Sequence, residues 1–399
     1  MKKVLIVIND LGSGGAQKSL ISFLKCLANT HYIKNYDIDL LVANKNGIFS
    51  DQIPKEINIL TAEKNMVWMN CPISNLATKQ AFSINSAVLK IKWMLVYRIA
   101  KKRKTFSSGK TLWNLWKNHI KANKTVYDIA ISYMDGWPNY YVMEKVIANK
   151  KVLWIHNEYK KLGYDARYDY GYYKNCNMII TISNSCRDSF IDVFPELASK
   201  IHVLENISLA GEIYNKAKEF EPLEYRDNNR LKIVSIGRLI EQKGFDIALM
   251  AAKELKTRNI LFTWYILGNG PDREKLVKLI TLYGLEQQVK LVGIKNNPYP
   301  YIACADIFVQ TSRFEGKSIV LDEAKILAKP IVVTNYTTVH DSIENMKSGI
   351  ITEMNGISIA DGICKLLSNP DLVKRMIQAL TDECRGNEKE LEKYIKYMF

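Results

Sequence analysis

The amino-acid sequence predicts an α/β protein made of two doubly wound domains. Short apolar runs typical of buried strands alternate with segments of helical periodicity along the whole chain. This alternation favours parallel sheets that are covered by helices on both faces. The length of 399 residues exceeds that of one ordinary domain and favours two. Each half also opens with a glycine-containing loop directly after its first strand-like run.

The strand-like runs define the order of the expected elements. They are Val4–Ile8, Ile38–Val42, Ile129–Ser132, Lys151–Ile155, Met178–Ile182, Lys232–Ile236, Leu261–Leu267, Val289–Val292, Ile307–Gln310 and Ile331–Val333. The interval 209–230 is polar, rich in charge and without a strand pattern, so we place the domain boundary there. We expect an N-terminal domain over 1–210, a C-terminal domain over 211–385, and a helix over 386–399 that packs back on the first domain. Two such domains would present their ligand crevices to each other across a cleft.

The composition is that of an ordinary globular protein, with 47% apolar and 24% charged residues. No run of eighteen uncharged apolar residues occurs, so we expect no transmembrane helix. The apolar stretch 4–8 is too short for a secretory leader and reads as a first strand. The seven cysteines contain no C-x-x-C pair, which favours reduced thiols in a cytosolic protein.

The net charge of +15 is concentrated in one region, about 64–127. Between Glu63 and Asp128 there is no acidic residue, but there are thirteen Lys or Arg. Two segments, 90–104 and 110–124, combine these cations with tryptophans at helical spacing, as a helix lying on anionic lipid requires. The candidate membrane-contact residues are Trp93, Lys101, Lys102, Arg103, Lys104, Trp113 and Trp116. One alternative is that the apolar residues are core with a solvated basic rim. Another is a nucleic-acid site, but no nucleic-acid motif accompanies the patch and we expect no such partner.

Two glutamates mark the strongest candidate site. Glu315 and Glu323 lie eight residues apart, the first in a turn after an apolar strand and the second in the following helix. Eight residues make about two helical revolutions, so the two positions share nearly the same face. The backbone N–H groups of Gly316, Lys317 and Ser318 would lie at the positive end of the helix dipole and could bind a phosphate. A carboxylate on each side of a phosphate cradle suits a sugar nucleotide. The alternative is a surface helix with two solvated glutamates.

Each glycine loop contributes further candidates. The loop after the first strand, 9–17, contains Gly14, Gly15 and Gln17 and could hold a phosphate or a sugar. It lacks the third glycine of the dinucleotide fingerprint. The loop after the first strand of the second half, 235–245, places Arg238 and Lys243 five residues apart, where cations can neutralise a diphosphate.

In this order and spacing, the segments resemble the retaining glycosyltransferases of the GT-B architecture, family 4, in particular bacterial capsule and surface-polysaccharide members. The matching motifs are Gly14-Gly15-Ala16-Gln17, Trp154-Ile155-His156-Asn157-Glu158, Ser235-Ile236-Gly237-Arg238 with Lys243-Gly244, Ile266-Leu267-Gly268-Asn269-Gly270-Pro271, Val292-Gly293, and Glu315-Gly316 with Asp322-Glu323-Ala324. The stretch 64–124 matches no motif. Where many relatives have Gly-Phe-Gly-Leu-Pro, this chain has Gly316-Lys317-Ser318-Ile319-Val320.

The resemblance implies a role for each matching residue. Arg238 and Lys243 would hold the donor diphosphate, Glu323 the ribose and Glu315 the donor sugar, while the amides of 316–318 would meet the distal phosphate. His156 would lie in the active site near the sugar and the acceptor; without the resemblance, a histidine satisfied at a strand end would be an equal reading. Contacts to the nucleobase would come from the backbone at Gly268, Asn269, Gly270, Gly293 and Ile294.

The resemblance also implies an activity. A hexose or N-acetylhexosamine would move from a nucleoside-diphosphate sugar, with a UDP-sugar as the first choice, to a hydroxyl with its anomeric configuration retained. The acceptor would be a lipid-linked saccharide, presented to a cytoplasmic protein held at the inner face of the cell membrane. We expect no metal and no cofactor, because the cations and helix-end amides would meet the diphosphate charge. Alternatives are a non-hydrolysing sugar-nucleotide epimerase, for which the sequence offers no convincing acid and base pair, and a non-catalytic membrane-bound partner of another transferase. The sequence does not indicate an oligomeric state.

Overall fold

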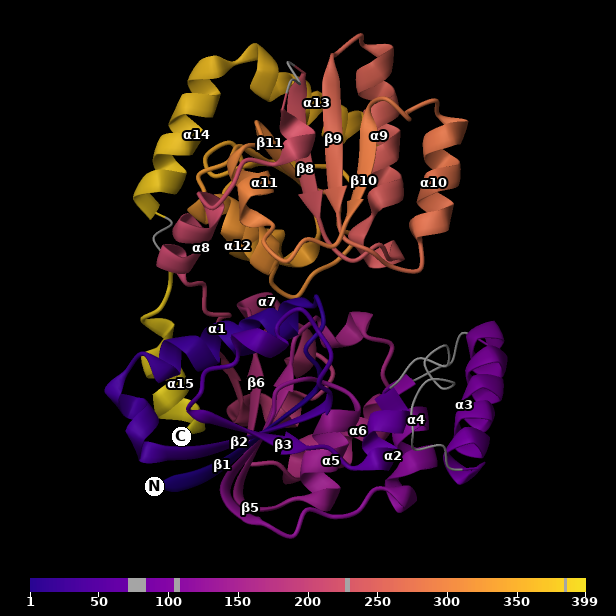
Figure 1. Ribbon diagram of the computed structural model, residues 1–399, viewed down its shortest axis with the longest axis vertical. Helices are drawn as coiled ribbons and strands as arrows, with labels where there is room; N and C mark the ends of the chain where they lie inside the picture. Colours follow the sequence, from indigo (N-terminus) through magenta and orange to yellow (C-terminus); the bar gives the residue numbers. More distant parts are fainter. Residues whose placement is uncertain (71–83, 104–107, 227–229, 384–385) are drawn as a thin grey trace. The chain divides into compact units, whose positions relative to one another are not determined.

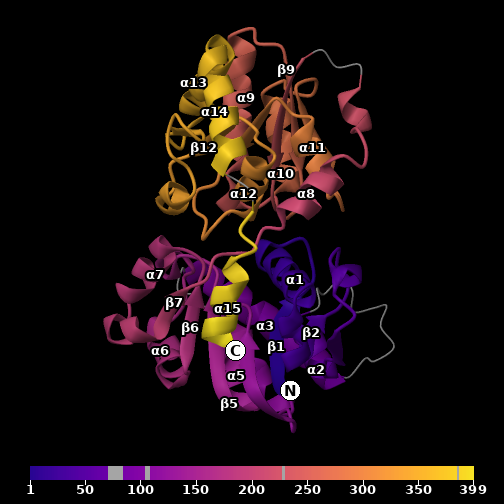
Figure 2. The same ribbon diagram turned by 90° about the vertical axis from the view of Figure 1, so that its left-hand side faces the viewer.

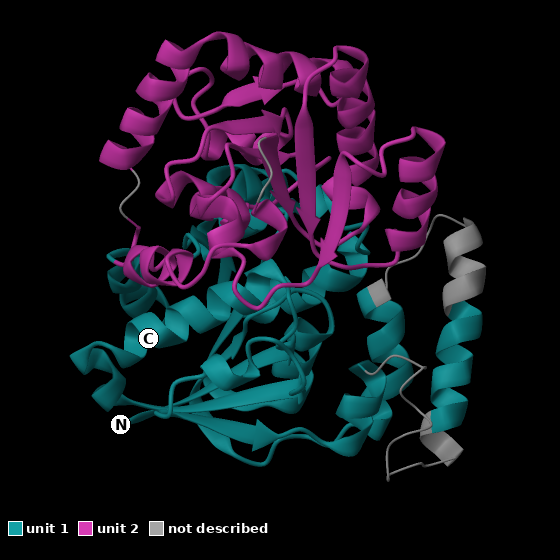
Figure 3. Ribbon diagram, turned by 45° about the horizontal axis from the view of Figure 1, so that its top comes forward, with its two compact units in different colours: residues 1–206, 389–399 teal, residues 207–388 magenta. Residues whose placement is uncertain are grey.

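The chain forms two compact units (Figure 3). The computed structural model describes residues 1–70, 84–103, 108–226, 230–383 and 386–399. Unit 1 contains Met1–Asn206 together with Lys389–Phe399, and unit 2 contains Ile207–Glu388. The division between the units falls at 206/207, just before the polar interval 209–230, which begins with a helix of unit 2, α8 (Ala210–Ala217).

Unit 1 is built on a parallel sheet of seven strands in the order β3-β2-β1-β4-β5-β6-β7 among the described residues (Figure 1). The strands are β1 (Lys2–Asp10), β2 (Tyr36–Asn44), β3 (Ile57–Thr61), β4 (Val126–Ser132), β5 (Ile147–Ile155), β6 (Met178–Thr181) and β7 (Ile201–Val203). The α-helices are α1 (Gly15–Ala28), α2 (Lys64–Asn70), α3 (Ile84–Arg103), α4 (Ser108–Trp116), α5 (Trp137–Lys145), α6 (Ala166–Asn175), α7 (Asn184–Ile191) and α15 (Glu390–Met398).

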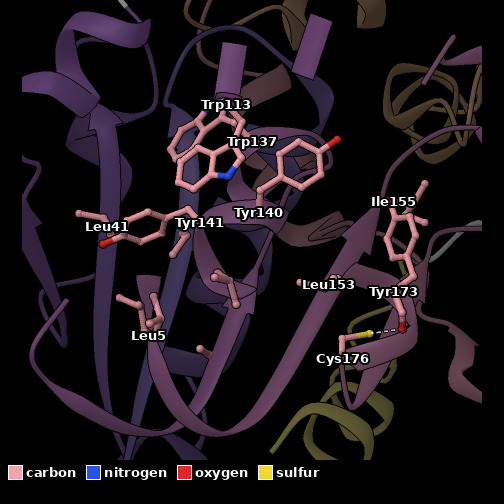
Figure 4. Packing of buried hydrophobic residues seen from close by; sticks show 14 of the residues in the cluster. Leu5, Leu41, Trp113, Trp137, Tyr140, Tyr141, Leu153, Ile155, Tyr173 and Cys176 are labelled. Atoms are coloured by element: carbon pink, nitrogen blue, oxygen red, sulfur yellow. Dashed lines mark hydrogen bonds between the residues drawn. The ribbon is translucent and has the colours of Figure 1, made fainter. Parts of the chain in front are cut away.

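Helices cover both faces of this sheet. On one face α1 lies beside α15 (Figure 2), and the ring of Tyr394 on α15 lies 4.9 Å from Phe23 of α1 and 5.6 Å from Trp154 of β5. On the other face α2, α4, α5, α6 and α7 share one hydrophobic cluster with the strands (Figure 4). The apolar strand residues are therefore buried on both sides, as the near-continuous apolar runs predict.

Unit 2 contains a parallel sheet of six strands in the order β10-β9-β8-β11-β12-β13, again among the described residues. The strands are β8 (Leu231–Ile236), β9 (Phe262–Leu267), β10 (Val289–Gly293), β11 (Ile307–Gln310), β12 (Ile331–Thr334) and β13 (Ile350–Thr352). The further helices are α9 (Phe245–Thr257), α10 (Arg273–Leu282), α11 (Tyr299–Ala303), α12 (Ile319–Ile326), α13 (Gly356–Ser368) and α14 (Pro370–Glu383). The helices α9, α10, α13 and α14 pack on one face, whereas α8, α11 and α12 lie on the other.

Both sheets have the same topology. The first strand of each unit lies in the middle, the next two strands follow on one side, and the chain then crosses to the other side. The strand order therefore reverses between β1 and β4 in unit 1 and between β8 and β11 in unit 2. In open parallel sheets, ligands bind at the carboxyl ends of the strands at such a switch point. In unit 2, the loops that carry Lys243 and Glu315 follow these two central strands.

The predicted strand-like runs all overlap strands, but three strands escape the sequence pattern. These are β3, a half-exposed edge strand, and the three-residue strands β7 and β13. Within the described parts of the chain, no helix is both long enough and apolar enough to span a membrane.

Candidate active site

The predicted sequence of strand, turn and helix around the two glutamates is present. The strand β11 ends at Gln310, and α12 begins after Ser318, whose Oγ accepts a hydrogen bond from the N–H of Leu321. Glu315 is 6% exposed and Glu323 is 1% exposed. The alternative of two solvated surface glutamates is therefore wrong. Carboxylates are buried at this depth only when other groups compensate their charge.

The compensation of Glu315 comes from three donors on a single carboxylate oxygen. Its Oε1 accepts hydrogen bonds from Lys243 Nζ at 2.6 Å, from Ser312 Oγ at 2.6 Å and from Gln310 Nε2 at 2.9 Å. Lys243 and Glu315 follow neighbouring parallel strands, β8 and β11, so their contact lies at the switch point of the sheet. The structure thus joins a predicted diphosphate cation to the predicted sugar-contacting carboxylate.

Arg238, the second predicted diphosphate cation, is placed differently. Its side chain is exposed, and it forms none of the side-chain hydrogen bonds or ion pairs found in the described part of the chain. Arg238 lies in the loop that directly follows β8. The same loop carries Lys243, which contacts Glu315. The switch point therefore has one cation that already neutralises a carboxylate and one that is available to an anionic ligand.

An ion pair that sequence reasoning missed fastens the two loops to each other. Arg313 donates to both carboxylate oxygens of Asp246, at 2.9 and 2.7 Å, and its Nη1 also donates to the carbonyl oxygen of Glu241 at 2.7 Å. Gln242 Nε2 donates to the carbonyl oxygen of Phe314 at 2.9 Å. Burial alone would raise the pKa of Asp246, but the hydrogen bonds and charge of Arg313 outweigh it and hold that pKa below its usual value. These contacts fix the positions from which Lys243 and Glu315 meet.

The predicted nucleobase-contacting backbone gathers at the adjacent strand ends. The N–H of Gly268 donates to the carbonyl oxygen of Gly293 at 2.8 Å, and the N–H of Leu239 donates to the carbonyl oxygen of Asn269 at 3.0 Å. Gly268 has φ of +138°, and a Cβ added there would lie 1.9 Å from the carbonyl oxygen of Gly237, so only glycine fits.

The remaining predicted donor-binding residues border this region. Gly270 also allows close backbone approach, since an added Cβ would lie 2.3 Å from the carbonyl oxygen of Leu239. Ile294 is 46% exposed just beyond β10. In the turn before α12, Gly316 and Ser318 are buried and Lys317 is half-buried.

In unit 1, the predicted active-site histidine lies at the end of β5. His156 is 8% exposed, and its Nε2 lies 2.9 Å from the carbonyl oxygen of Tyr133, which sets Nε2 as the protonated nitrogen. Burial lowers the pKa of His156, so the imidazole is neutral at neutral pH. Its backbone N–H donates to Asp135 at 3.2 Å, and Asp135 also accepts from the hydroxyl of Tyr164 at 2.7 Å. The sequence motif did not include Asp135, although it follows the strand-like run of β4.

The first glycine loop lies at the switch point of unit 1. Gly14 is the N-cap of α1, followed by Gly15 as its first residue. The side chain of Gln17 is 3% exposed and turns back to donate to Asp10 at 3.0 Å. A Cβ on Gly14 would lie 2.0 Å from Oε1 of Gln17. The glycine therefore lets the Gln17 side chain fold over the start of the helix.

Two of the predicted membrane contacts are wrong. Trp113 and Trp116 are 0% exposed and belong to the hydrophobic core of unit 1. Figure 4 shows Trp113 within this core. The ring of Trp113 lies 6.3 Å from that of Tyr141 in an edge-on arrangement. The face of α4 that carries them thus faces the core, as the alternative reading of this segment expected. A helical face with tryptophans reads alike in a sequence whether protein or lipid covers it.

The other predicted membrane contacts belong to α3 or follow it. Trp93 is half-buried, whereas Val88, Ile91 and Leu95 are 44%, 52% and 53% exposed. Lys90 is buried and donates to the carbonyl oxygens of Trp68 and Met69 on α2, so it is not on the exposed side. Residues 101–103 (Lys101, Lys102 and Arg103) end α3, but their side chains, like the whole of Lys104, lie outside the described part of the structure.

Two Rossmann-like parallel sheets in one chain, with a carboxylate and cations at the switch point of the second, are the architecture of the GT-B fold. A crystal structure of Anabaena Alr3699/HepE in complex with UDP and glucose has the same fold, with a TM-score of 0.69 over 99% of this chain and 98% of that chain, at 15% identity. Residues 216–382 match the family model of glycosyl transferases group 1. The chain therefore has the GT-B fold, and its C-terminal part resembles the glycosyl transferases group 1.

Two relatives of the chain are named bacterial transferases. One relative is the N-acetylgalactosamine-N,N'-diacetylbacillosaminyl-diphospho-undecaprenol 4-alpha-N-acetylgalactosaminyltransferase of Campylobacter jejuni. It is 25% identical, and the match covers 94% of this chain and 92% of the relative. The alpha-D-kanosaminyltransferase of Streptomyces kanamyceticus is 26% identical, but this match spans only 50% of this chain and 53% of that relative.

Proposed function

We propose that this glycosyltransferase moves a hexose or N-acetylhexosamine from a UDP-sugar to a hydroxyl of a lipid-linked saccharide, with retention of the anomeric configuration, in bacterial surface-polysaccharide synthesis. The observation that carries the proposal is the Lys243–Glu315 contact with the exposed Arg238 at the switch point of unit 2. The UDP and glucose of the HepE complex and the diphospho-undecaprenol in the name of the Campylobacter jejuni relative's reaction support the two substrate classes.

In the proposed reaction, the residues of unit 2 hold the donor. Arg238 and Lys243 meet the diphosphate and stabilise the charge that grows on it as the bond from the anomeric carbon to the phosphate oxygen breaks. Glu323 accepts from the ribose, and Glu315 accepts from a hydroxyl of the donor sugar. The acceptor oxygen bonds to the anomeric carbon on the same face, and its proton passes to the leaving diphosphate. No protein base, metal or cofactor enters this scheme.

Release of nucleotide from a donor panel tests the proposal. We would incubate the protein with UDP-glucose, UDP-N-acetylglucosamine, UDP-N-acetylgalactosamine and GDP-mannose, with and without EDTA and an undecaprenyl-diphosphate-linked saccharide. We expect acceptor-dependent UDP release from one donor that is indifferent to EDTA. NMR of the product should show the anomeric configuration of the donor, and an inverted product would refute the retaining mechanism.

Matched variants connect this activity to the site. Arg238→Ala should lower kcat/KM about 100-fold or more, because it removes a charge-assisted contact to the leaving group. Arg258→Ala is the control, since Arg258 in the same unit pairs with Glu254 and Asp361 on the surface. If Arg238→Ala and Arg258→Ala behaved alike, the assigned site would be wrong. Donor binding without turnover in the presence of every acceptor would instead indicate a non-catalytic partner of another transferase.

As the second part of this proposal, α3 holds the enzyme at the inner, anionic face of the cell membrane. The exposed residues Val88, Ile91 and Leu95 follow helical spacing, so they form one apolar stripe, with the exposed Lys92 at its side. The surrounding region, 64–127, contains no acidic residue. An apolar stripe among cations is the arrangement with which a helix lies on anionic lipid.

Vesicle flotation tests this docking surface. Wild type should float with vesicles that contain 30% phosphatidylglycerol and not with pure phosphatidylcholine, and salt should weaken the binding. Replacing Val88, Ile91 and Leu95 together by serine should abolish flotation. The control replaces Leu261 and Leu282 by serine, since both are 74% exposed in unit 2. Equal flotation of wild type with both lipids, or of both variants with anionic vesicles, would refute α3 as the docking element.

A further inference from the structure

Gln310 occupies an unusual position for a polar side chain. It is the last residue of β11, in the middle of the sheet, and it is 7% exposed. Its Nε2 lies within hydrogen-bond distance of three groups of the following turn: Glu315 Oε1 at 2.9 Å, Ser318 Oγ at 2.9 Å and Ser312 Oγ at 3.2 Å. One amide nitrogen at the end of the strand thus touches three of the side chains that shape the turn.

The other end of the same amide is left without a hydrogen bond. Gln310 Oε1 is buried and has no hydrogen-bond partner in the described part of the structure. An unsatisfied buried carbonyl is unfavourable by about 1–3 kcal/mol. Turning the amide over would place this oxygen against the carboxylate of Glu315, which is worse electrostatically. The negative charge of Glu315 therefore keeps the amide nitrogen of Gln310 turned toward it. The main effect of the Gln310 side chain is on that carboxylate.

The arrangement distinguishes the two oxygens of Glu315. Oε1 accepts from Gln310, Ser312 and Lys243, so its acceptor capacity is filled from the protein side. Oε2 accepts none of the hydrogen bonds formed among the described residues. A carboxylate that accepts three hydrogen bonds on one oxygen has little freedom to rotate. The lone pairs of the second oxygen therefore point in a fixed direction. This oxygen is thus suited to accept from a ligand hydroxyl in that direction.

We propose that Gln310 is a positioning residue, which together with Ser312 holds Oε1 of Glu315 so that Oε2 accepts a hydroxyl of the donor sugar. This inference rests on the proposed function, since it takes the sugar of a nucleotide sugar as the ligand of Glu315. Gln310 does not touch the substrate and acts through the carboxylate. It affects the recognition of the sugar and leaves the recognition of the nucleotide to other residues.

The test separates sugar binding from nucleotide binding. Calorimetry would measure the Kd of UDP and of the UDP-sugar that the donor panel identifies, for wild type, Gln310→Leu and Ser312→Ala. Gln310→Leu keeps the volume and removes the donor. Loss of a hydrogen bond to a charged group corresponds to about a 10- to 100-fold loss of affinity. We expect that loss in the affinity for the UDP-sugar and in kcat/KM, with the Kd of UDP changed less than about twofold. Ser312→Ala, a smaller change at the same oxygen, should show the same pattern.

Gln288→Leu is the matched control. Gln288 lies in unit 2, just before β10, and its Oε1 is likewise buried without a hydrogen-bond partner among the described residues. This variant should leave both affinities unchanged. Equal losses for UDP and UDP-sugar in the Gln310 and Ser312 variants would show a merely structural role and overturn the inference, as would full activity in both. If wild type bound and turned over no donor, the proposed function would fall, and this inference with it.

Discussion

The Arg313–Asp246 ion pair offers a sharp test of how the site loops are held. The two side chains are 32% and 21% exposed, and two parallel N–H···O contacts of 2.9 and 2.7 Å join them. Exposed pairs contribute about 0.2–1 kcal/mol, and buried hydrogen bonds to charged groups about 1.5–3 kcal/mol. For this half-buried, bidentate pair we expect a coupling free energy of about 1–2 kcal/mol between Arg313→Ala and Asp246→Ala in a double-mutant cycle.

Hydrogen exchange is the suitable assay, because the pair fastens loops and its loss should open them locally. The amides of Lys243, Gly244 and Arg313 donate to carbonyl oxygens of the loop 240–242. A loss of 1–2 kcal/mol corresponds to about 5- to 30-fold faster exchange of these amides. The same change should be absent in Arg258→Ala. Unchanged exchange, or a coupling below about 0.3 kcal/mol, would refute the view that this pair holds the site together.

The pH dependence of the same pair has a definite sign. The pKa of Asp246 is lowered in the folded protein, so the unfolded chain binds its proton more readily. The stabilisation by Arg313 is therefore complete above the ordinary carboxyl pKa of about 3.9. It should disappear as the pH falls through the lowered pKa, and Arg313→Ala should remove this acid-dependent part of the stability.

Three other predictions concern single positions. Trp113→Ala should lower the free energy of unfolding by about 3–5 kcal/mol in urea melts, because the ring is fully buried. It should leave the vesicle flotation of the folded protein unchanged. A stable variant that no longer floats would show that Trp113 contacts the membrane after all. Burial lowers the pKa of His156, so the free energy of unfolding of wild type should fall as the pH drops from 7.5 to 5. In urea melts at these two pH values, His156→Gln should reduce the fall. An equal fall in wild type and variant would contradict the buried neutral imidazole. Gly244→Ala should destabilise the protein by about 1–3 kcal/mol and lower donor turnover, since Gly244 has φ of +62° and an added Cβ would lie 2.0 Å from the carbonyl oxygen of Thr311. Gly171→Ala is its control, because an added Cβ there meets nothing within 4 Å, and equal effects of the two changes would contradict the strain argument.

Much of the fold was predictable because parallel strands buried on both faces leave long apolar runs in the sequence. The run 307–310 and the helix after Ser318 illustrate this, as both follow from side-chain pattern alone. β3, with one buried residue among exposed ones, has no such pattern, because an edge strand is covered on fewer sides. The polar interval after 209 gave no sign of the helix α8, because α8 needs only a narrow apolar stripe to pack on α11 and α12.

The site was predictable only in part. Motif spacing identified Lys243 and Glu315, whose contact at 2.6 Å depends on two strands being neighbours in the sheet. Arg313 and Asp246 form a surrounding contact, and no sequence rule pairs residues that lie 67 positions apart. The two tryptophans of α4 show the opposite limit. The sequence identified an amphipathic helix correctly but could not tell whether protein or lipid covers its apolar side.

The return of the C-terminal residues to unit 1 has a consequence for biosynthesis. The last helix, α15, carries Tyr394, which is fully buried against Phe23 and Trp154 and donates its hydroxyl to the carbonyl oxygen of Glu205 at 2.9 Å. While the ribosome is still translating residues 207–388, nothing covers this apolar part of the nascent first unit. The second unit, in contrast, is continuous in sequence and can collapse as soon as it has emerged. Although it is made first, the N-terminal half should therefore be the last to become resistant to protease, once α15 has been translated and has docked on it.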